Sequence, residues 1–137
     1  MTLEQLSEVS ELHSRIYSLE QDLETLKQNA YPAASRASGM PHGSGISDRT
    51  AILVSEIDEL ECDIAELKQQ LNEKIVEVRA FSKTIPDIET RTIFRLRFIH
   101  GLLWKEIGSL IGKTGNNVSI RCLRYLKKTN NEALKKP

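Results

Sequence analysis

Two long stretches of the chain place apolar residues three and four positions apart, which is the spacing of one helical face. The first predicts a helix over about residues 3–29 whose apolar positions are Val9, Leu12, Ile16, Leu19, Leu23 and Leu26. The second predicts a helix from a Ser47–Asp48 cap to Pro86, on Leu53, Ile57, Leu60, Ile64, Leu67, Leu71, Val78, Phe81 and Ile85. Lys74 is the one seam position that interrupts this heptad spacing, and Cys62 is expected on the outer face.

Residues 30–47, "AYPAASRASGMPHGSGIS", lose this periodicity and are rich in Pro, Gly and Ser, which predicts a flexible loop. The amphipathic helices on either side must cover their apolar stripes. They can fold back on each other as an antiparallel hairpin, or each can pair with its twin in a second chain. Val54 and Ile75 widen the stripe beyond a two-stranded seam, and this favours hairpins that also form a homodimer.

After Pro86 the pattern predicts three short helices separated by glycines. Asp87 caps the first, on Ile88, Ile93, Leu96 and Ile99 with Phe94 and Phe98 alongside, and Gly101 ends it. The second covers about residues 104–111 and ends at Gly112. Thr114 caps the third, over about residues 115–128, whose inward positions are Val118, Cys122, Tyr125 and Leu126.

The predicted fold is therefore all-α: a long helical coiled-coil hairpin, residues 1–85, followed by a three-helix helix-turn-helix domain, residues 86–128. Residues 129–137 are interpreted as a basic tail.

The charge balance changes between residues 85 and 86, where the predicted hairpin ends and the three-helix domain begins. Residues 1–85 carry 15 acidic and 8 basic side chains, a balance of −7, whereas residues 86–137 carry 4 acidic and 11 basic, a balance of +7. The neutral total thus conceals a basic segment, and such a segment indicates a polyanionic partner.

The last helix has the side chains to read DNA. Two helices joined by a tight Gly-containing turn are typical of a helix-turn-helix, whose second helix enters the major groove. If Val118 and Cys122 hold the last helix against Ile107 and Ile111, the open face carries Asn116, Asn117, Ile120, Arg121 and Arg124. Asn pairs with adenine, Arg with guanine, and an aliphatic side chain meets the thymine methyl group. The candidates for phosphate contacts are Lys105, Lys113, Lys127 and Lys128.

The segment "IPDIETRTIFRLRFIHGLLWKEIGSLIGKTGNNVSIRCLRYLKK" resembles the fourth region of sigma-70 factors, which reads the promoter −35 element. The chain is more similar to small sigma-like regulators of phages and prophages of Gram-positive bacteria, which also carry a coiled-coil front half. The "MPHGSGISDRTA" loop resembles theirs, so the resemblance covers about residues 26–128. Lys113 departs from the family by replacing the usual apolar residue of the turn, and Gly115 departs at the start of the last helix.

The resemblance implies that the open-face residues named above contact bases and backbone. It also implies an activator of late phage genes that binds double-stranded DNA upstream of promoters and contacts RNA polymerase. The segment with which sigma factors melt promoter DNA has no counterpart here, so a complete sigma factor is not expected.

Two other classes remain as alternatives. A small terminase subunit also combines a helix-turn-helix with an oligomerising coil, although its DNA module usually comes first. A coiled-coil adaptor would use the basic end for a protein partner. An enzyme is not expected, since no catalytic constellation, metal-ligand spacing or cofactor motif stands out. Two isolated cysteines, no signal peptide and no apolar run of membrane length indicate the cytoplasm, by the resemblance that of a bacterial host.

Overall fold

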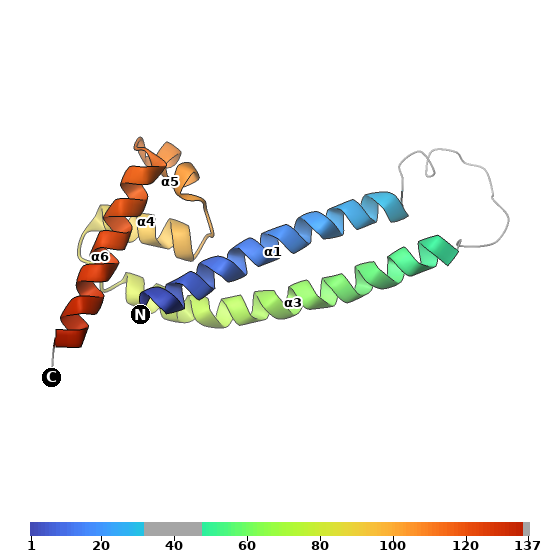
Figure 1. Cartoon of the computed structure of the whole chain (residues 1–137), viewed down its shortest axis with the longest axis horizontal. Coiled ribbons are helices and arrows are strands. Elements are labelled where there is room, and N and C mark those ends of the chain that lie inside the picture. Colours follow the sequence, from blue (N-terminus) through green and yellow to red (C-terminus); the bar gives the residue numbers. More distant parts are fainter. Residues whose placement is uncertain (32–47, 136–137) are drawn as a thin grey trace. The chain divides into compact units, whose positions relative to one another are not determined.

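The computed structural model of the chain describes residues 1–31 and 48–135. This part of the chain is all-α and holds no strand. Its helices are α1 (Leu3–Ala30), α3 (Asp48–Ser82), α4 (Ile88–Phe98), α5 (Trp104–Ile111) and α6 (Gly115–Lys135) (Figure 1). The predicted Ser47 cap and residues 32–47 of the predicted loop lie outside the described residues. The chain divides into two compact units, Arg15–Gln69 and Met1–Ser14 with Gln70–Pro137.

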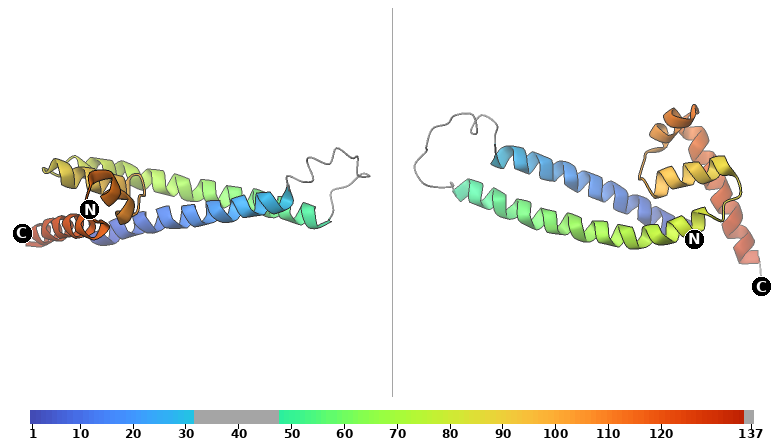
Figure 2. Two further views of the ribbon diagram at one scale, coloured as in Figure 1. Left: turned by 90° about the horizontal axis from the view of Figure 1, so that it is seen from above. Right: turned by 180° about the vertical axis from the view of Figure 1, so that it is seen from behind.

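In the unit Arg15–Gln69, α1 and α3 run alongside each other in opposite directions (Figure 2). The ion pairs show the direction, because Glu20 meets Lys68 at 2.7 Å whereas Lys27, further along α1, meets the earlier residue Glu61 at 3.4 Å. Ile16, Ile57 and Ile64 are buried in this unit. The apolar stripes predicted from the sequence therefore provide its core.

Burial along α3 follows the heptad unevenly. The buried seam positions lie seven residues apart, at Ile57, Ile64, Leu71 and Val78. The intervening seam positions Leu53, Leu60 and Leu67 are only half-buried, and Cys62 is exposed as predicted. One of the two seam positions is thus covered and the other keeps part of its apolar surface in solvent.

The polar interruption of the seam has a partner. The ammonium group of Lys74 lies 3.1 Å from the carboxylate of Glu8 on α1, in the unit that contains Met1–Ser14 and Gln70–Pro137. The Lys74 side chain is only 38% exposed, which is typical of a long cationic side chain whose stem covers apolar surface while its charge stays in solvent.

Helix α3 ends at Ser82, whereas the sequence predicted that it continues to Ile85. Two hydroxyl groups explain the early end: Ser82 Oγ donates to Arg79 O at 2.7 Å, and Thr84 Oγ1 donates to Phe81 O at 2.6 Å. These bonds occupy the last carbonyls of the helix, and local side-chain bonds of this kind compete with helix continuation. The turn that follows buries Ile85 completely.

Two of the three short helices begin at the predicted caps, and the third has a cap that was not predicted. Asp87 accepts a hydrogen bond from Thr90 N at 3.1 Å at the start of α4, and Thr114 Oγ1 accepts one from Asn117 N at 3.2 Å at the start of α6. At the start of α5, Glu106 accepts from Leu103 N at 3.2 Å. These bonds satisfy N–H groups that a helix leaves without internal partners.

The core of this cluster is densely buried. Phe94 lies with its ring centroid 5.4 Å from Phe81 and 4.9 Å from Phe98, which are favourable aromatic separations. Trp104 lies edge-on to Phe98 at 6.4 Å and has the guanidinium of Arg97 over its ring. The other fully buried side chains are Ile93, Ile107, Val118, Cys122 and Leu126.

Helix α6 continues to Lys135 instead of ending near Lys128, so most of the predicted tail is helical. With its amide oriented to satisfy both neighbours, Asn130 donates to Met1 O at 3.0 Å and accepts from Leu3 N at 3.2 Å. A sequence pattern read locally gives no sign of this contact with the first residues of the chain. None of the helices in residues 1–31 and 48–135 combines the length and the apolar character needed to cross a membrane.

Candidate nucleic-acid interface

The turn between α5 and α6 depends on glycines. Gly112 ends α5 with a φ of 76°, in the left-handed region that favours glycine. A Cβ atom at Gly108 would lie 2.4 Å from Lys113 O, so only glycine lets the returning backbone approach α5 this closely. At Gly115 the corresponding distance to Lys105 Cα is 3.0 Å. The glycine at position 115 thus has a local reason, since the start of α6 lies against the start of α5.

The inner face of α6 is firmly packed: Val118, Cys122 and Leu126 are all buried, as is Ile107 of α5, the helix that packs against α6. Burial raises the pKa of the Cys122 thiol to about 12, even though the positive charge of Arg97 acts in the opposite direction. The thiol therefore stays protonated and serves as a small apolar side chain. Tyr125, predicted to face inward with them, is only half-buried.

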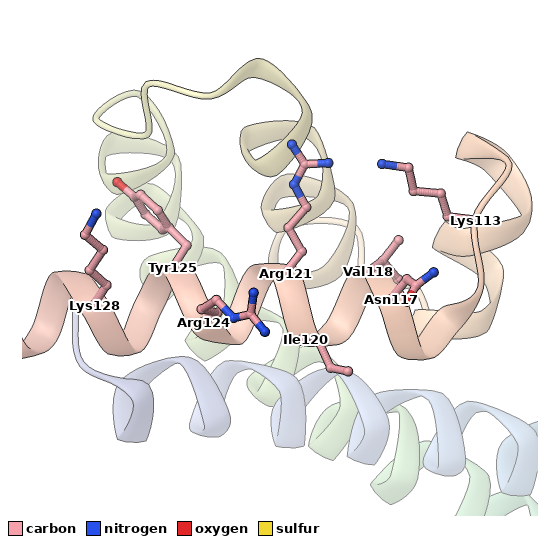
Figure 3. Close-up of a pocket in the computed structure, with 8 residues that line it drawn as sticks. All are labelled: Lys113, Asn117, Val118, Ile120, Arg121, Arg124, Tyr125 and Lys128. Carbon is pink, nitrogen blue, oxygen red and sulfur yellow. The ribbon is translucent and has the colours of Figure 1, made fainter.

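An open groove of about 710 Å³ lies along α6, where the exposed side chains meet the buried Val118 of the inner face. Its lining residues are Lys113, Asn117, Val118, Ile120, Arg121, Arg124, Tyr125 and Lys128 (Figure 3). Figure 3 shows that Ile120 leaves α6 on the side opposite to Arg121 and Tyr125. Ile120 keeps 44% of its surface exposed, which is high for an apolar side chain beside a core. The groove therefore offers cations, an amide and an aliphatic contact on one helix.

The structure brings six of the predicted site residues into this groove and leaves three outside it. Asn116, Lys105 and Lys127 are exposed but do not line the groove. Arg124 and Lys128 are also exposed, and neither shows an ion pair with an acidic side chain within residues 1–31 and 48–131. These two cations are available to a partner.

Unlike Arg124 and Lys128, Arg121 and Lys113 form ion pairs with acidic residues at the start of α4. Arg121 Nη2 lies 2.7 Å from Asp87 Oδ2, and its Nη1 lies 2.8 Å from Glu89 Oε1. Lys113 Nζ pairs with the same oxygen of Glu89. Arg121 was predicted to lie on the open face; it does line the groove, but its guanidinium also forms ion pairs within the protein.

The pKa of each carboxyl reflects these contacts. The pKa of Asp87 lies below its usual value, first because of the hydrogen bonds from the Thr90 hydroxyl and backbone, and then because of Arg121. The hydrogen bond from Lys113, followed by that from Arg121, lowers the pKa of Glu89. Partial desolvation would lower the pKa of Arg121, but its bonds to the two carboxylates outweigh that effect and raise it. All three groups are therefore charged at neutral pH.

Sequence reasoning missed two features of this surface. Asp87 was assigned only a capping role and Glu89 none, although both carboxylates reach the groove cations. Their ion pairs join residues 24 to 34 positions apart, so no local pattern predicts them. Tyr125 was assigned to the core, yet it lies one turn beyond Arg121 and lines the groove.

The chain matches no model of a known protein family, no curated protein and no solved structure.

Proposed function

We propose that this protein is a sequence-specific double-stranded DNA-binding regulator of transcription, with α6 as the helix that enters the major groove. One observation carries the proposal: α6 has an exposed face with Asn117, Ile120 and Arg124, and its opposite face is buried in a packed core. A rigid helix with exposed amide, aliphatic and guanidinium groups suits direct reading of base edges.

In this proposal, α4, α5 and α6 constitute a helix-turn-helix domain of the sigma region 4 type, and α1 and α3 constitute a coiled-coil hairpin. The turn at Gly112 and the close approach at Gly108 support the first assignment. The opposed ion pairs Glu20–Lys68 and Lys27–Glu61 support the second. The balance of +7 over residues 86–137 favours a polyanionic partner for this end of the chain.

The proposed role is that of an activator of late phage genes in the cytoplasm of a bacterial host, acting without the promoter-melting part of a sigma factor. Contact with RNA polymerase rests on the family resemblance alone. A homodimer has a physical argument as well, because half-buried Leu53, Leu60 and Leu67 leave apolar surface along α3 for a second copy. Sedimentation should give a dimer, whereas a ring of many subunits would favour the terminase class.

Binding experiments test the DNA reading directly. Duplexes are enriched from a random pool by the purified protein, and affinity is then measured for the enriched and a shuffled duplex. Affinity should fall steeply between about 50 and 200 mM salt, because phosphate contacts release counterions. A protein that binds neither duplex at the lowest salt would end the proposal and favour the adaptor class.

The variant Arg124→Ala tests whether this side chain contacts a base. It should weaken binding to the enriched duplex by about 1–3 kcal/mol, with a smaller loss on the shuffled one. The control is Arg15→Ala, which removes the same charge from an exposed position of α1. Equal losses on both duplexes would reassign Arg124 to a phosphate contact.

A further inference from the structure

Two carboxylates reach into the candidate DNA surface and occupy two of its cations. We call Asp87 and Glu89 the acidic clamp. Its contacts are Asp87 with Arg121 at 2.7 Å, Glu89 with Arg121 at 2.8 Å, and Glu89 with Lys113. Arg121 and Lys113 both line the groove on α6 (Figure 3). The clamp thus acts on the proposed binding surface itself.

The clamp is built into the fold. Asp87 Oδ2 is fixed by two hydrogen bonds from Thr90, at 3.1 Å from the backbone N–H and 2.6 Å from the hydroxyl. Thr90 is buried, so the carboxylate that caps α4 has little freedom to turn away. Each of the two terminal nitrogens of Arg121 meets a different carboxylate, and the planar guanidinium fork is well suited to such divided contacts.

The clamp is also accessible to solvent and therefore reversible. The exposed side-chain fractions are 36% for Arg121, 49% for Asp87 and 39% for Glu89. Ion pairs at this exposure contribute little to folding stability, because water screens them and side-chain entropy opposes them. A competing hydrogen-bond acceptor can replace the carboxylates, and DNA offers two kinds: anionic phosphates and neutral acceptors on the base edges.

We propose that the acidic clamp sets the specificity of this surface by restraining Arg121 and Lys113 and by repelling phosphates, so that random DNA binds more weakly than cognate DNA. This rests on the proposed function of α6. Binding to random DNA is almost entirely electrostatic, so it loses the contribution of both restrained cations. Cognate DNA gains base contacts from groups outside the clamp, among them Asn117 and Arg124, and depends less on the restrained pair.

The test is the double variant Asp87→Asn with Glu89→Gln. Asn is as good a helix cap as Asp, and Gln matches Glu in size, so the fold of α4 is kept. Affinity for a shuffled duplex should rise between about five- and fifty-fold near 0.1 M salt, the upper figure corresponding to two more released counterions. The salt dependence on that duplex should steepen by about 1 to 2 in log–log slope, and the ratio of cognate to random affinity should fall.

The matched control is Glu56→Gln with Asp58→Asn, which changes net charge equally on exposed positions of α3 outside the groove. It should leave the ratio of affinities unchanged. If the control lowers the ratio as much as the clamp variant does, overall charge is the cause and the inference is wrong.

A second measurement needs no DNA. In the wild-type protein, the NMR signals of the Arg121 guanidinium should show slowed rotation and hydrogen exchange, and both should be lost in the clamp variant. Free rotation in the wild type would overturn the inference. If the wild type binds DNA but the clamp variant keeps the same random affinity and slope, only the inference fails. If neither protein binds DNA, the proposed function fails and the inference with it.

Discussion

The long helices and the cluster of short helices achieve burial by different means. Along α3, buried apolar positions recur only every seventh residue, as at Ile57 and Ile64, and the intervening seam positions are half-buried. In the cluster of α4, α5 and α6, burial is dense and each helix start has its own polar bond, as at Asp87 and Thr114. Periodicity thus specifies the long helices, whereas individual residues specify the short ones. Truncation should therefore cost more in the cluster.

The largest expected effect is that of Phe94→Ala. Phe94 is completely buried between Phe81 and Phe98, so its removal should lower the free energy of unfolding by about 3–5 kcal/mol. Leu60→Ala, at a half-buried seam position, should cost only about 1 kcal/mol. Urea denaturation followed by the fluorescence of Trp104 and by circular dichroism measures both. Equal losses would remove the contrast between the two regions.

A charge in the seam should have the next largest effect. Ile64→Asp places an unpaired carboxylate at a buried position and should destabilise the long helices by about 2–4 kcal/mol. Any dimer formed through the same seam should dissociate, which sedimentation detects. Cys62→Asp, two residues earlier but exposed, is the control and should melt like the wild type. An unchanged melting profile for Ile64→Asp would show that the register of the stripe is wrong.

Glycine substitutions sharpen the comparison further, because a single atom matters only where backbones meet. Gly108→Ala should destabilise the cluster by about 1–3 kcal/mol, since its Cβ would lie 2.4 Å from Lys113 O. Gly112→Ala meets no atom within 4 Å and should cost only the left-handed backbone energy, about 1–2 kcal/mol. The denaturation midpoints of the two variants test this difference. An unchanged midpoint for Gly108→Ala would mean that the turn can open.

The smallest expected effect is on pH dependence. The folded-state pKa of Asp87 and of Glu89 lies below the ordinary values of 3.8 and 4.5. Each carboxylate therefore stabilises the fold above its ordinary value and loses that contribution as pH falls through its lowered folded-state pKa. The clamp variant should lack this part of the acid sensitivity. Melting temperatures from about pH 6 to 3 measure it, and identical slopes for variant and wild type would contradict the prediction.

Much of the fold was predictable because its determinants are local. Heptad spacing predicted both long helices, and the caps Asp87 and Thr114 marked where two of the short helices begin. The errors have non-local or competing causes. Hydroxyl bonds at Ser82 and Thr84 ended α3 early, and a contact between Asn130 and the first residues accompanies the longer α6.

In the candidate site, too, the local features were predictable and the non-local ones were not. The helical period correctly predicted the exposure of Asn116, Asn117, Ile120 and Arg124, because the core positions of α6 fix its outer face. The helical period could not predict the ion pair between Arg121 and Asp87. Asp87 lies 34 residues away along the chain and reaches Arg121 only because α4 packs on α6. Whether these residues contact DNA stays a prediction.

The two cysteines differ in exposure, so one of them can be labelled selectively. Cys62 is exposed on α3, whereas Cys122 is buried with a pKa of about 12. A maleimide dye should therefore attach to Cys62 alone, without mutation and at a residue that does not line the groove. Mixed donor- and acceptor-labelled samples would then report energy transfer between copies of the natural sequence, while α6 remains unmodified.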